Sequence, residues 1–207
     1  LHYYTNFTNH KPGFNKEFID RVCDDMNLKS LGETQRKVTL AFDEMKVSQG
    51  LVYSHSTSDI TGFTSLGTMN TEFEEFARKC GESDNPKMAS HVLVLMVRAI
   101  CSSYRKPVAY FSTHGVTGDQ LYAITMEALE YLALCGFVVK ALVSDGASAN
   151  SGLYKLLTSS SHHDHCFVNP FNDETVYLFS DVPHLMKTTR NNLENSGYHQ
   201  KTRNLKV

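Results

Sequence analysis

The chain has 207 residues, of which 41% are hydrophobic and 20% charged, and its formal net charge is -2. This composition excludes a disordered or collagen-like chain, and the length suffices for one domain with a hydrophobic core and the start of a second. The near-neutral charge does not by itself indicate a nucleic-acid partner, because domains that bind nucleic acid often carry a basic surface.

The first predicted element is an amphipathic helix over residues 15–26, with apolar side chains at helical spacing, which we interpret as a docking or linker helix. Residues 37–43 include β-branched and aromatic side chains and have the length of a strand, so they predict a strand. A short apolar run at 51–53 follows a turn signal, and the two runs together predict a hairpin. A capping box at Thr71-Glu-Phe-Glu74 indicates the start of a short helix.

Two more strands are predicted at residues 91–100 and 107–111. The first is nearly all apolar, so we expect both of its faces to be covered. The clearest helix begins with the capping box Thr117-Gly-Asp-Gln120 and ends before Gly136. Because a buried strand over 137–145 follows at once, the order strand, helix, strand indicates a parallel arrangement.

The remaining pattern predicts a helix over 148–157 with Ser148 as its cap, a strand over 176–181 and a helix from about Pro183. The order is therefore antiparallel strands first, then helix, strand, helix, strand. It predicts an α/β fold of the RNase H-like kind, with a mixed sheet flanked by helices and incomplete at its C-terminal end.

The five cysteines are dispersed and form no C-x-x-C pair, so we interpret them as reduced core residues of an intracellular protein. No apolar run approaches the roughly 18 residues of a membrane span, and no signal peptide precedes the first periodic segment. We therefore expect no membrane partner. The first residue is Leu rather than Met, as expected for a piece of a larger protein.

Asp43 and Asp145 each end a hydrophobic strand, where an ionised carboxylate is costly unless it is solvated, paired or bound to metal. If the two strands are neighbours, both carboxylates converge on one site at the edge of the sheet. Paired Mg²⁺ ions held there would activate a hydroxyl and stabilise the leaving oxygen of a phosphodiester. The alternative reading is that both are turn residues without metal, since Asp145-Gly146 is a common turn pair.

Neighbouring acids fit this site less well. Glu44 follows Asp43 in a continuing strand and is expected to point to the opposite face. Asp59 lies in a turn setting, and Asp119 is explained by the helix start that it occupies.

A basic helix face is predicted near the C-terminus, with His184, Lys187 and Arg190 on one side and Asp181 as the cap. It would contact a phosphate or orient the catalytic edge, and the alternative is a solvated face. His162-His-Asp-His165-Cys166 lacks the spacing of zinc sites and is interpreted as an exposed loop.

The segments Phe42–Val47, Ser144–Asn150 and Phe179–Asn192 resemble the P-element and THAP-domain-containing transposase family. The third segment is the most specific, because the string Asp-x-Pro-His-Leu-x-Lys-x-x-Arg-Asn is long and irregular. The resemblance extends from about Lys37 to the end of the chain.

This resemblance implies a cut-and-paste DNA transposase whose RNase H-like domain binds Mg²⁺ through an Asp, Asp, Glu triad. The first two positions match Asp43 and Asp145, and the Glu lies beyond this chain, so the chain alone is expected to be inactive. DNA is the implied partner, GTP binds an insertion domain, the longer protein forms a homo-oligomer, and the nucleus is the implied location.

The implied domain division is an N-terminal helical or linker segment at 1–36, the N-terminal portion of the RNase H-like catalytic domain at 37–180, and the start of the GTP-binding insertion domain at 181–207. One alternative is a domesticated derivative that binds DNA or protein without catalysis. The other is an unrelated RNase H-like nuclease, and the string from Asp181 onward argues against it.

Overall fold

The computed structural model describes residues 12–14, 24, 32–55, 58–67, 87–159 and 163–194. The predicted helix at 15–26, apart from a single helical residue at Asp24, and the predicted capping box at 71–74 lie outside the described residues. The elements in chain order are β1 Gly13–Phe14, η2 Glu33–Arg36, β2 Lys37–Lys46, β3 Val52–Ser54, β4 Asp59–Thr61, β5 His91–Ala99, β6 Arg105–Thr113, α4 Gly118–Leu134, β7 Val138–Ser144, α5 Ser148–Thr158, β8 Cys166–Val168, β9 Thr175–Ser180 and α6 Val182–Glu194.

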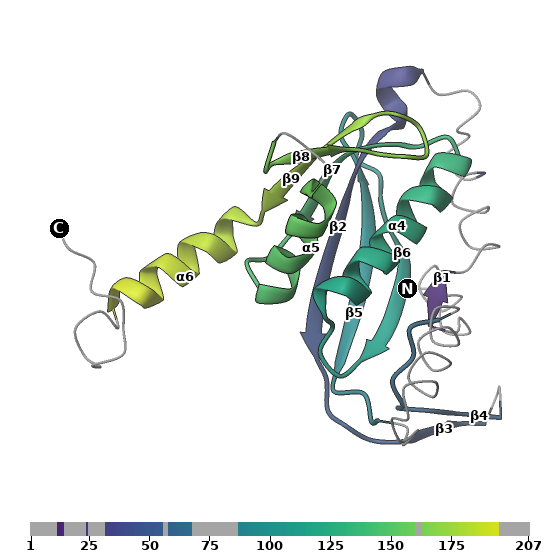
Figure 1. Cartoon of the computed structure of the whole chain (residues 1–207). Helices are drawn as coiled ribbons and strands as arrows, with labels where there is room; N and C mark the ends of the chain where they lie inside the picture. Colours follow the sequence, from purple (N-terminus) through teal and green to yellow (C-terminus); the bar gives the residue numbers. More distant parts are fainter. Residues whose placement is uncertain are drawn as a thin grey trace.

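The main sheet has seven strands in the order β1-β6-β5-β2-β7-β9-β8. The first half is antiparallel, since β5 pairs antiparallel with both β6 and β2. The second half is parallel where β2 meets β7 and where β7 meets β9. Helix α4 connects β6 to β7, but the direct parallel pairing predicted for these two strands is wrong, because β5 and β2 lie between them. Helices α4 and α5 lie against the same side of the sheet (Figure 1). The predicted mixed sheet flanked by helices is confirmed.

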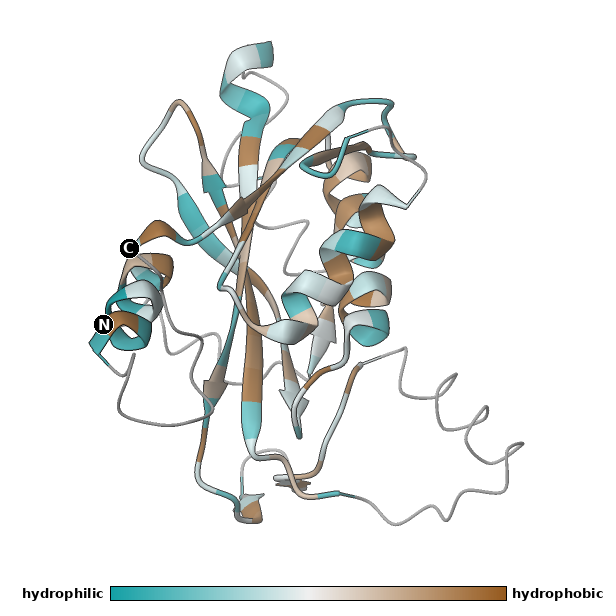
Figure 2. Ribbon diagram, turned by 60° about the vertical axis from the view of Figure 1, so that its left-hand side comes forward, coloured by the Kyte–Doolittle hydropathy of each residue, from teal (hydrophilic) through white to brown (hydrophobic). Residues whose placement is uncertain are grey.

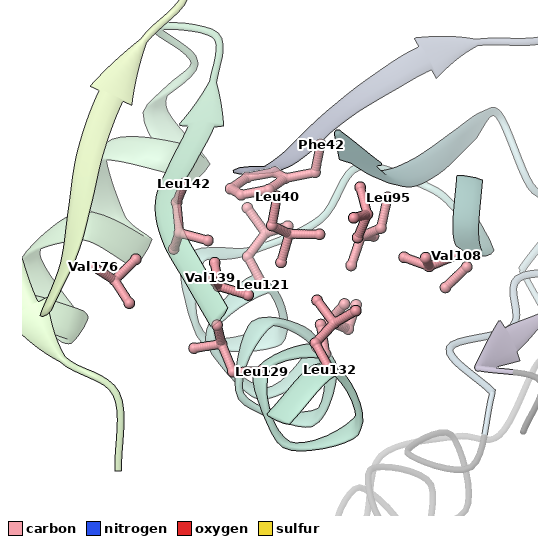
Figure 3. Close-up of a cluster of buried hydrophobic side chains, with 14 of the residues drawn as sticks. Leu40, Phe42, Leu95, Val108, Leu121, Leu129, Leu132, Val139, Leu142 and Val176 are labelled. Atoms are coloured by element: carbon pink, nitrogen blue, oxygen red, sulfur yellow. The ribbon is translucent and has the colours of Figure 1, made fainter. Parts of the chain in front are cut away.

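Side chains alternate along β2 because successive residues of a strand point to opposite faces. Val38, Leu40 and Phe42 are buried beneath the helices, on what we call the helix-covered face, whereas Asp43 and Met45 on the opposite face are exposed. Leucines of α4 and strand residues such as Leu40, Leu95 and Leu142 meet in one core (Figure 3). The core thus fixes which face of the sheet remains open for a site.

Helix α4 follows its sequence signals closely. Thr117 caps it through its hydroxyl, which accepts from the Gln120 amide, while the Gln120 side chain accepts from the Thr117 amide. Gly136, directly beyond the helix end, has φ of 85°, a conformation that favours glycine. The first residue of α4, Gly118, lies against the backbone of Gly152, so α4 and α5 approach closely there.

Strand β7 contains one extra residue relative to β2. Val38 is aligned with Val139, but Thr39 is aligned with Ala141, so Lys140 is the extra residue and has no aligned residue on β2. Lys140 forms an ion pair with Glu174. The pKa of Glu174 is lowered by this hydrogen bond and by the charge of Lys140. After this irregularity, Leu142 and Ser144 are buried on the helix-covered face.

The predicted hairpin between residues 37–43 and 51–53 is wrong. Strand β3 pairs with β4 instead, through a turn in which Ser58 has φ of 56°. Strand β2 continues to Lys46, and β5 pairs with one edge of it up to that residue, so this edge is not open to β3.

Two smaller expectations are also corrected. Strand β5 is covered on one face only within the described chain, because Met96 and Arg98 are exposed. Ser148 does not cap α5, since Ala147 occupies the cap position without a side-chain bond.

The predicted helix near Pro183 is confirmed as α6. The main-chain carbonyl of Asp181 accepts from the Leu185 amide at its first turn. None of its residues is buried, and apolar Leu185 and Met186 are exposed. Figure 2 shows α6 on the other side of the sheet from α4 and α5.

Candidate active site

Asp43 and Asp145 belong to neighbouring parallel strands. Asp145 directly follows β7, as predicted, but Asp43 lies inside β2, which continues to Lys46, so the prediction that Asp43 ends its strand is wrong. Ala41 is aligned with Val143, and each carboxylate lies two residues further along its strand. Adjacent strands are about 4.8 Å apart. Both residues line one open groove of about 440 Å³ on the face opposite α4 and α5. The structure therefore brings together the two residues on which the sequence prediction depended.

One oxygen of Asp145 is held by hydrogen bonds and the other is directed elsewhere. Oδ1 accepts from the Ala147 amide at 2.9 Å and from Asn150 Nδ2 at 2.5 Å. Asn150 Nδ2 also lies 3.3 Å from the Asp145 carbonyl. Oδ2 lies 4.0 Å from His184 Nε2, and the Asp145 side chain is 26% exposed. This arrangement fixes the rotamer of the carboxylate and leaves Oδ2 available to a ligand.

Tyr154 connects the two strand ends behind the groove. Its hydroxyl donates to the Phe179 carbonyl at 2.9 Å and is 2.8 Å from Ser144 Oγ. Ser144 Oγ also lies 3.2 Å from the Asp145 carbonyl, so each hydroxyl has a carbonyl acceptor within reach and either one can donate in the contact between them. Burial raises the pKa of Tyr154, and its hydrogen bonds to Ser144 partly oppose that shift. Helix α5 thereby holds the ends of β7 and β9 in position.

Asp181 and His184 also line the groove. Strand β9 pairs in parallel with β7, Ser144 being aligned with Ser180, and the Asp181 amide donates to the Ser144 carbonyl at 2.8 Å. Asp181 therefore directly follows β9, as Asp145 directly follows β7, while Asp43 lies inside the third of these neighbouring parallel strands, β2. The sequence indicated Asp181 only as a helix cap or an outer residue of the site.

The other basic residues of α6 do not reach the groove. Lys187 is exposed and absent from its lining, and Arg190 pairs with Glu194 at 3.6 Å. Glu44 points to the opposite face, as predicted, where its carboxylate accepts from the Thr113 hydroxyl. Asn150 and Tyr154 were not identified from the sequence as parts of the site, although Asn150 lies in the segment Ser144–Asn150 that carries the family resemblance.

The groove combines an apolar floor with oxygen ligands. Ala41, Val94, Met96 and Val143 line it beside the carboxylates. Carboxylate oxygens are the ligands that Mg²⁺ prefers, so the donor set fits that ion. Within the ranges that the structure describes, no group of three acidic, histidine or cysteine side chains is arranged to hold a metal. Two carboxylates alone would therefore need a further ligand to hold a metal ion.

The histidine-rich segment resembles an ordinary loop. The rings of His163 and His165 lie 5.5 Å apart, and Cys166 is buried at the start of β8.

Among the described helices, none combines the length and apolarity that a membrane span requires.

Comparison with known proteins identifies the class to which this fold and groove belong. A family model described as "TNP-like, RNase H N-terminal domain" matches residues 10–158. Because this match covers most of the chain, the chain belongs to that family, and its fold is RNase H-like.

The relatives narrow the class to P-element transposases. The chain is 29% identical over 180 residues to the Drosophila melanogaster protein "Transposable element P transposase". It matches a chain of the solved "Drosophila P element transposase strand transfer complex" with a TM-score of 0.62 and 27% identity. These matches cover 86% and 90% of this chain, but only 20% of the curated relative and 35% of the solved chain. This chain is therefore an RNase H-like domain of the TNP-like family that is similar to part of P-element transposases, and it spans about a fifth of the curated relative's length.

Proposed function

We propose that the chain supplies two of the metal-binding carboxylates, Asp43 and Asp145, for hydrolysis and strand transfer at phosphodiesters of DNA. The observation that carries the proposal is the position of both carboxylates at the same level of neighbouring parallel strands, where they line one open groove. If Asp43 and Asp145 were ordinary turn residues, nothing would place these two distant parts of the sequence in the same groove.

The chain's own residues have distinct roles in this proposal. Asp43 and Asp145 hold the divalent cations, and Asn150 with the Ala147 amide keeps the Asp145 carboxylate oriented. His184, near Asp145 Oδ2, contacts the substrate phosphate or helps to orient the carboxylate. When bound, Mg²⁺ would activate the attacking hydroxyl and stabilise the leaving oxygen. The apolar floor limits the access of water to one side of the groove.

For the longer protein, the proposal includes a glutamate outside this chain as the third ligand. It also includes DNA ends and target as partners, GTP bound to a domain that begins at about residue 181, homo-oligomer formation and a nuclear location. The 207-residue chain alone is then expected not to cut DNA. Cleavage of DNA by this chain with Mg²⁺, lost on Asp145→Asn, would contradict that expectation.

Metal binding to the chain tests the proposal directly. Mn²⁺ broadens NMR signals of residues that surround its site, so it serves as a probe for Mg²⁺. We expect broadening centred on Asp43 and Asp145, and more than about tenfold weaker binding in Asp43→Asn and in Asp145→Asn. The control is Asp119→Asn, which removes an exposed carboxylate from the first turn of α4. Equal binding by all three variants would refute the assignment.

A non-catalytic, domesticated protein is the second candidate. In the part of the chain that the structure describes, the two carboxylates have no third ligand beside them, as in an incomplete metal site. The two candidates differ in one measurement. The longer protein should cleave transposon-end DNA with Mg²⁺ and lose this activity on Asp43→Asn if it is an enzyme. If the wild type and Asp43→Asn bind DNA equally and the wild type does not cleave it, the domesticated alternative is favoured.

A further inference from the structure

A second pocket lies at the same end of β2, beyond the candidate active site. It has a volume of about 670 Å³ and is lined by Lys46, Val47, Ser48, Gln49, Ser90 and His91. Lys46 is the last residue of β2 and is paired with His91, the first residue of β5. Because side chains alternate along a strand, Lys46 points to the face opposite that of Asp43. The pocket is therefore separate from the groove but belongs to the same edge of the sheet.

A chain of hydrogen bonds behind this pocket determines where the histidine protons lie. His114 Nδ1 is 3.1 Å from the Met88 carbonyl and 3.2 Å from Ser90 Oγ. A carbonyl can only accept, so His114 Nδ1 carries the proton and Ser90 Oγ accepts from it. The Ser90 hydroxyl is then free to donate to His91 Nδ1 at 2.8 Å.

This direction of bonding fixes the tautomer of His91. Ser90 is only 8% exposed, so its hydroxyl proton needs a protein partner, and His91 Nδ1 is the acceptor within reach. Neutral His91 must then carry its proton on Nε2. A donor N–H, held in place by Ser90 and His114, is thus present on a residue that lines the pocket.

The lining of the pocket favours an anion. The exposed ammonium group of Lys46 and the hydroxyl of Ser48 are donors, and no carboxylate is among the lining residues. The nearest acid along β2, Glu44, accepts from the Thr113 hydroxyl. A tetrahedral anion with several acceptor oxygens is the ligand that such a set of donors suits.

The distance from the active site indicates the source of that anion. Three residues of a strand span about 10 Å, which is about three nucleotide rises of 3.4 Å along a DNA strand, and the opposite orientation of the Asp43 and Lys46 side chains adds to this separation. Resting on the function proposed above, we infer that this pocket binds a backbone phosphate of the DNA a few nucleotides from the phosphodiester held at Asp43. Lys46 and His91 contact the phosphate, and Ser90 and His114 act as positioning residues for His91.

Titration of the 207-residue chain with inorganic phosphate tests the pocket itself. We expect the ¹⁵N signal of His91 Nε2 to shift with phosphate and the shift to be lost in Lys46→Ala. Lys155→Ala removes the same charge from an exposed position on α5 and should leave the shift unchanged. In Ser90→Ala, the His91 ¹⁵N signals should move towards a mixture of tautomers, which a merely structural role of Ser90 would not produce.

Binding of a short fluorescent DNA duplex at several salt concentrations tests the source of the phosphate. Loss of one phosphate contact lowers the slope of log affinity against log salt by about one. We expect this change for Lys46→Ala and not for Lys155→Ala, and we expect His91→Gln, which retains an N–H donor, to bind more tightly than His91→Leu. Equal slopes for the two lysine variants, or a His91 signal that responds to inorganic phosphate but not to DNA, would overturn the inference.

The Asp43→Asn variant separates this inference from the proposed function. It should lose Mn²⁺ binding and keep the phosphate response of His91. If Asp43→Asn leaves Mn²⁺ binding intact while the Lys46 effects are observed, the metal assignment fails and the phosphate pocket stands. If metal binding behaves as proposed and the Lys46 effects are missing, the pocket assignment fails.

Discussion

Replacement of Asn150 by alanine should weaken both the fold and the candidate metal site. Asn150 is 8% exposed, and its Nδ2 donates to the Asp145 carboxylate and lies within bonding distance of the Asp145 carbonyl. A hydrogen bond to a charged group contributes about 1.5–3 kcal/mol and a neutral one about 0.5–1.5 kcal/mol. Alanine returns roughly 0.5 kcal/mol through its higher helix propensity. The free energy of unfolding should therefore fall by about 2–3 kcal/mol.

Thermal and metal measurements on Asn150→Ala check both parts of this prediction. For a domain of this size, the loss corresponds to a decrease in Tm of about 5–10 °C. Mn²⁺ binding should also weaken by about tenfold, because Asp145 Oδ1 loses one of its two donors. Ser151→Ala is the matched control, since Ser151 lies next to it on α5, is exposed and bonds only to a helix carbonyl. A variant as stable as Ser151→Ala, with wild-type Mn²⁺ affinity, would refute the reasoning.

Three further substitutions test the packing around the site. Tyr154→Phe removes the hydroxyl that joins β7 to β9 and should lower the free energy of unfolding by about 1–2 kcal/mol. Because burial raises the pKa of Tyr154, its titration should leave wild-type stability intact below about pH 10 and reduce it as the pH rises through the raised value. Urea denaturation across this range should show a smaller alkaline loss in the variant, and equal losses would contradict the assignment. Gly118→Ala places a Cβ 3.2 Å from the Gly152 backbone, and calorimetry should show a loss of about 1–3 kcal/mol, whereas Gly50→Ala, with open space around it, should be neutral. Leu142→Ala in the fully buried core should cost about 2–5 kcal/mol by urea denaturation, and a loss below 1 kcal/mol would mean that the site collapses without a cavity.

Local signals in the sequence were sufficient where one element determines its own structure. The capping box that begins at Thr117 correctly predicted the start of α4, and Gly136 correctly predicted its end. Both signals act within a single turn of the helix. The convergence of Asp43 and Asp145 was predicted only on the condition that their strands are neighbours, and the pairing of β2 with β7 meets that condition. Both signals describe backbone geometry, which sequence patterns reflect directly.

Pairings between distant segments were not predictable in the same way. The expected hairpin after β2 failed because its edge is taken by β5, which begins at residue 91. The roles of Asn150 and Tyr154 depend on how α5 packs beside the ends of β7 and β9, which is a property of the assembled sheet. The Ser90 hydrogen bonds likewise join residues from separate strands and a loop.

The extra residue in β7 determines which way Asp145 points. Simple alternation from buried Val139 would assign Asp145 to the helix-covered face, and only the shift in register at Lys140 directs it into the groove beside Asp43. A single deletion anywhere from residue 140 to 144 leaves the same number of residues between Val139 and Asp145. Such a deletion keeps the carboxylate in the groove when the strand straightens opposite β2, and it inverts the carboxylate when the irregularity is retained. We therefore expect lineages that retain activity to lose the extra residue and the irregularity together.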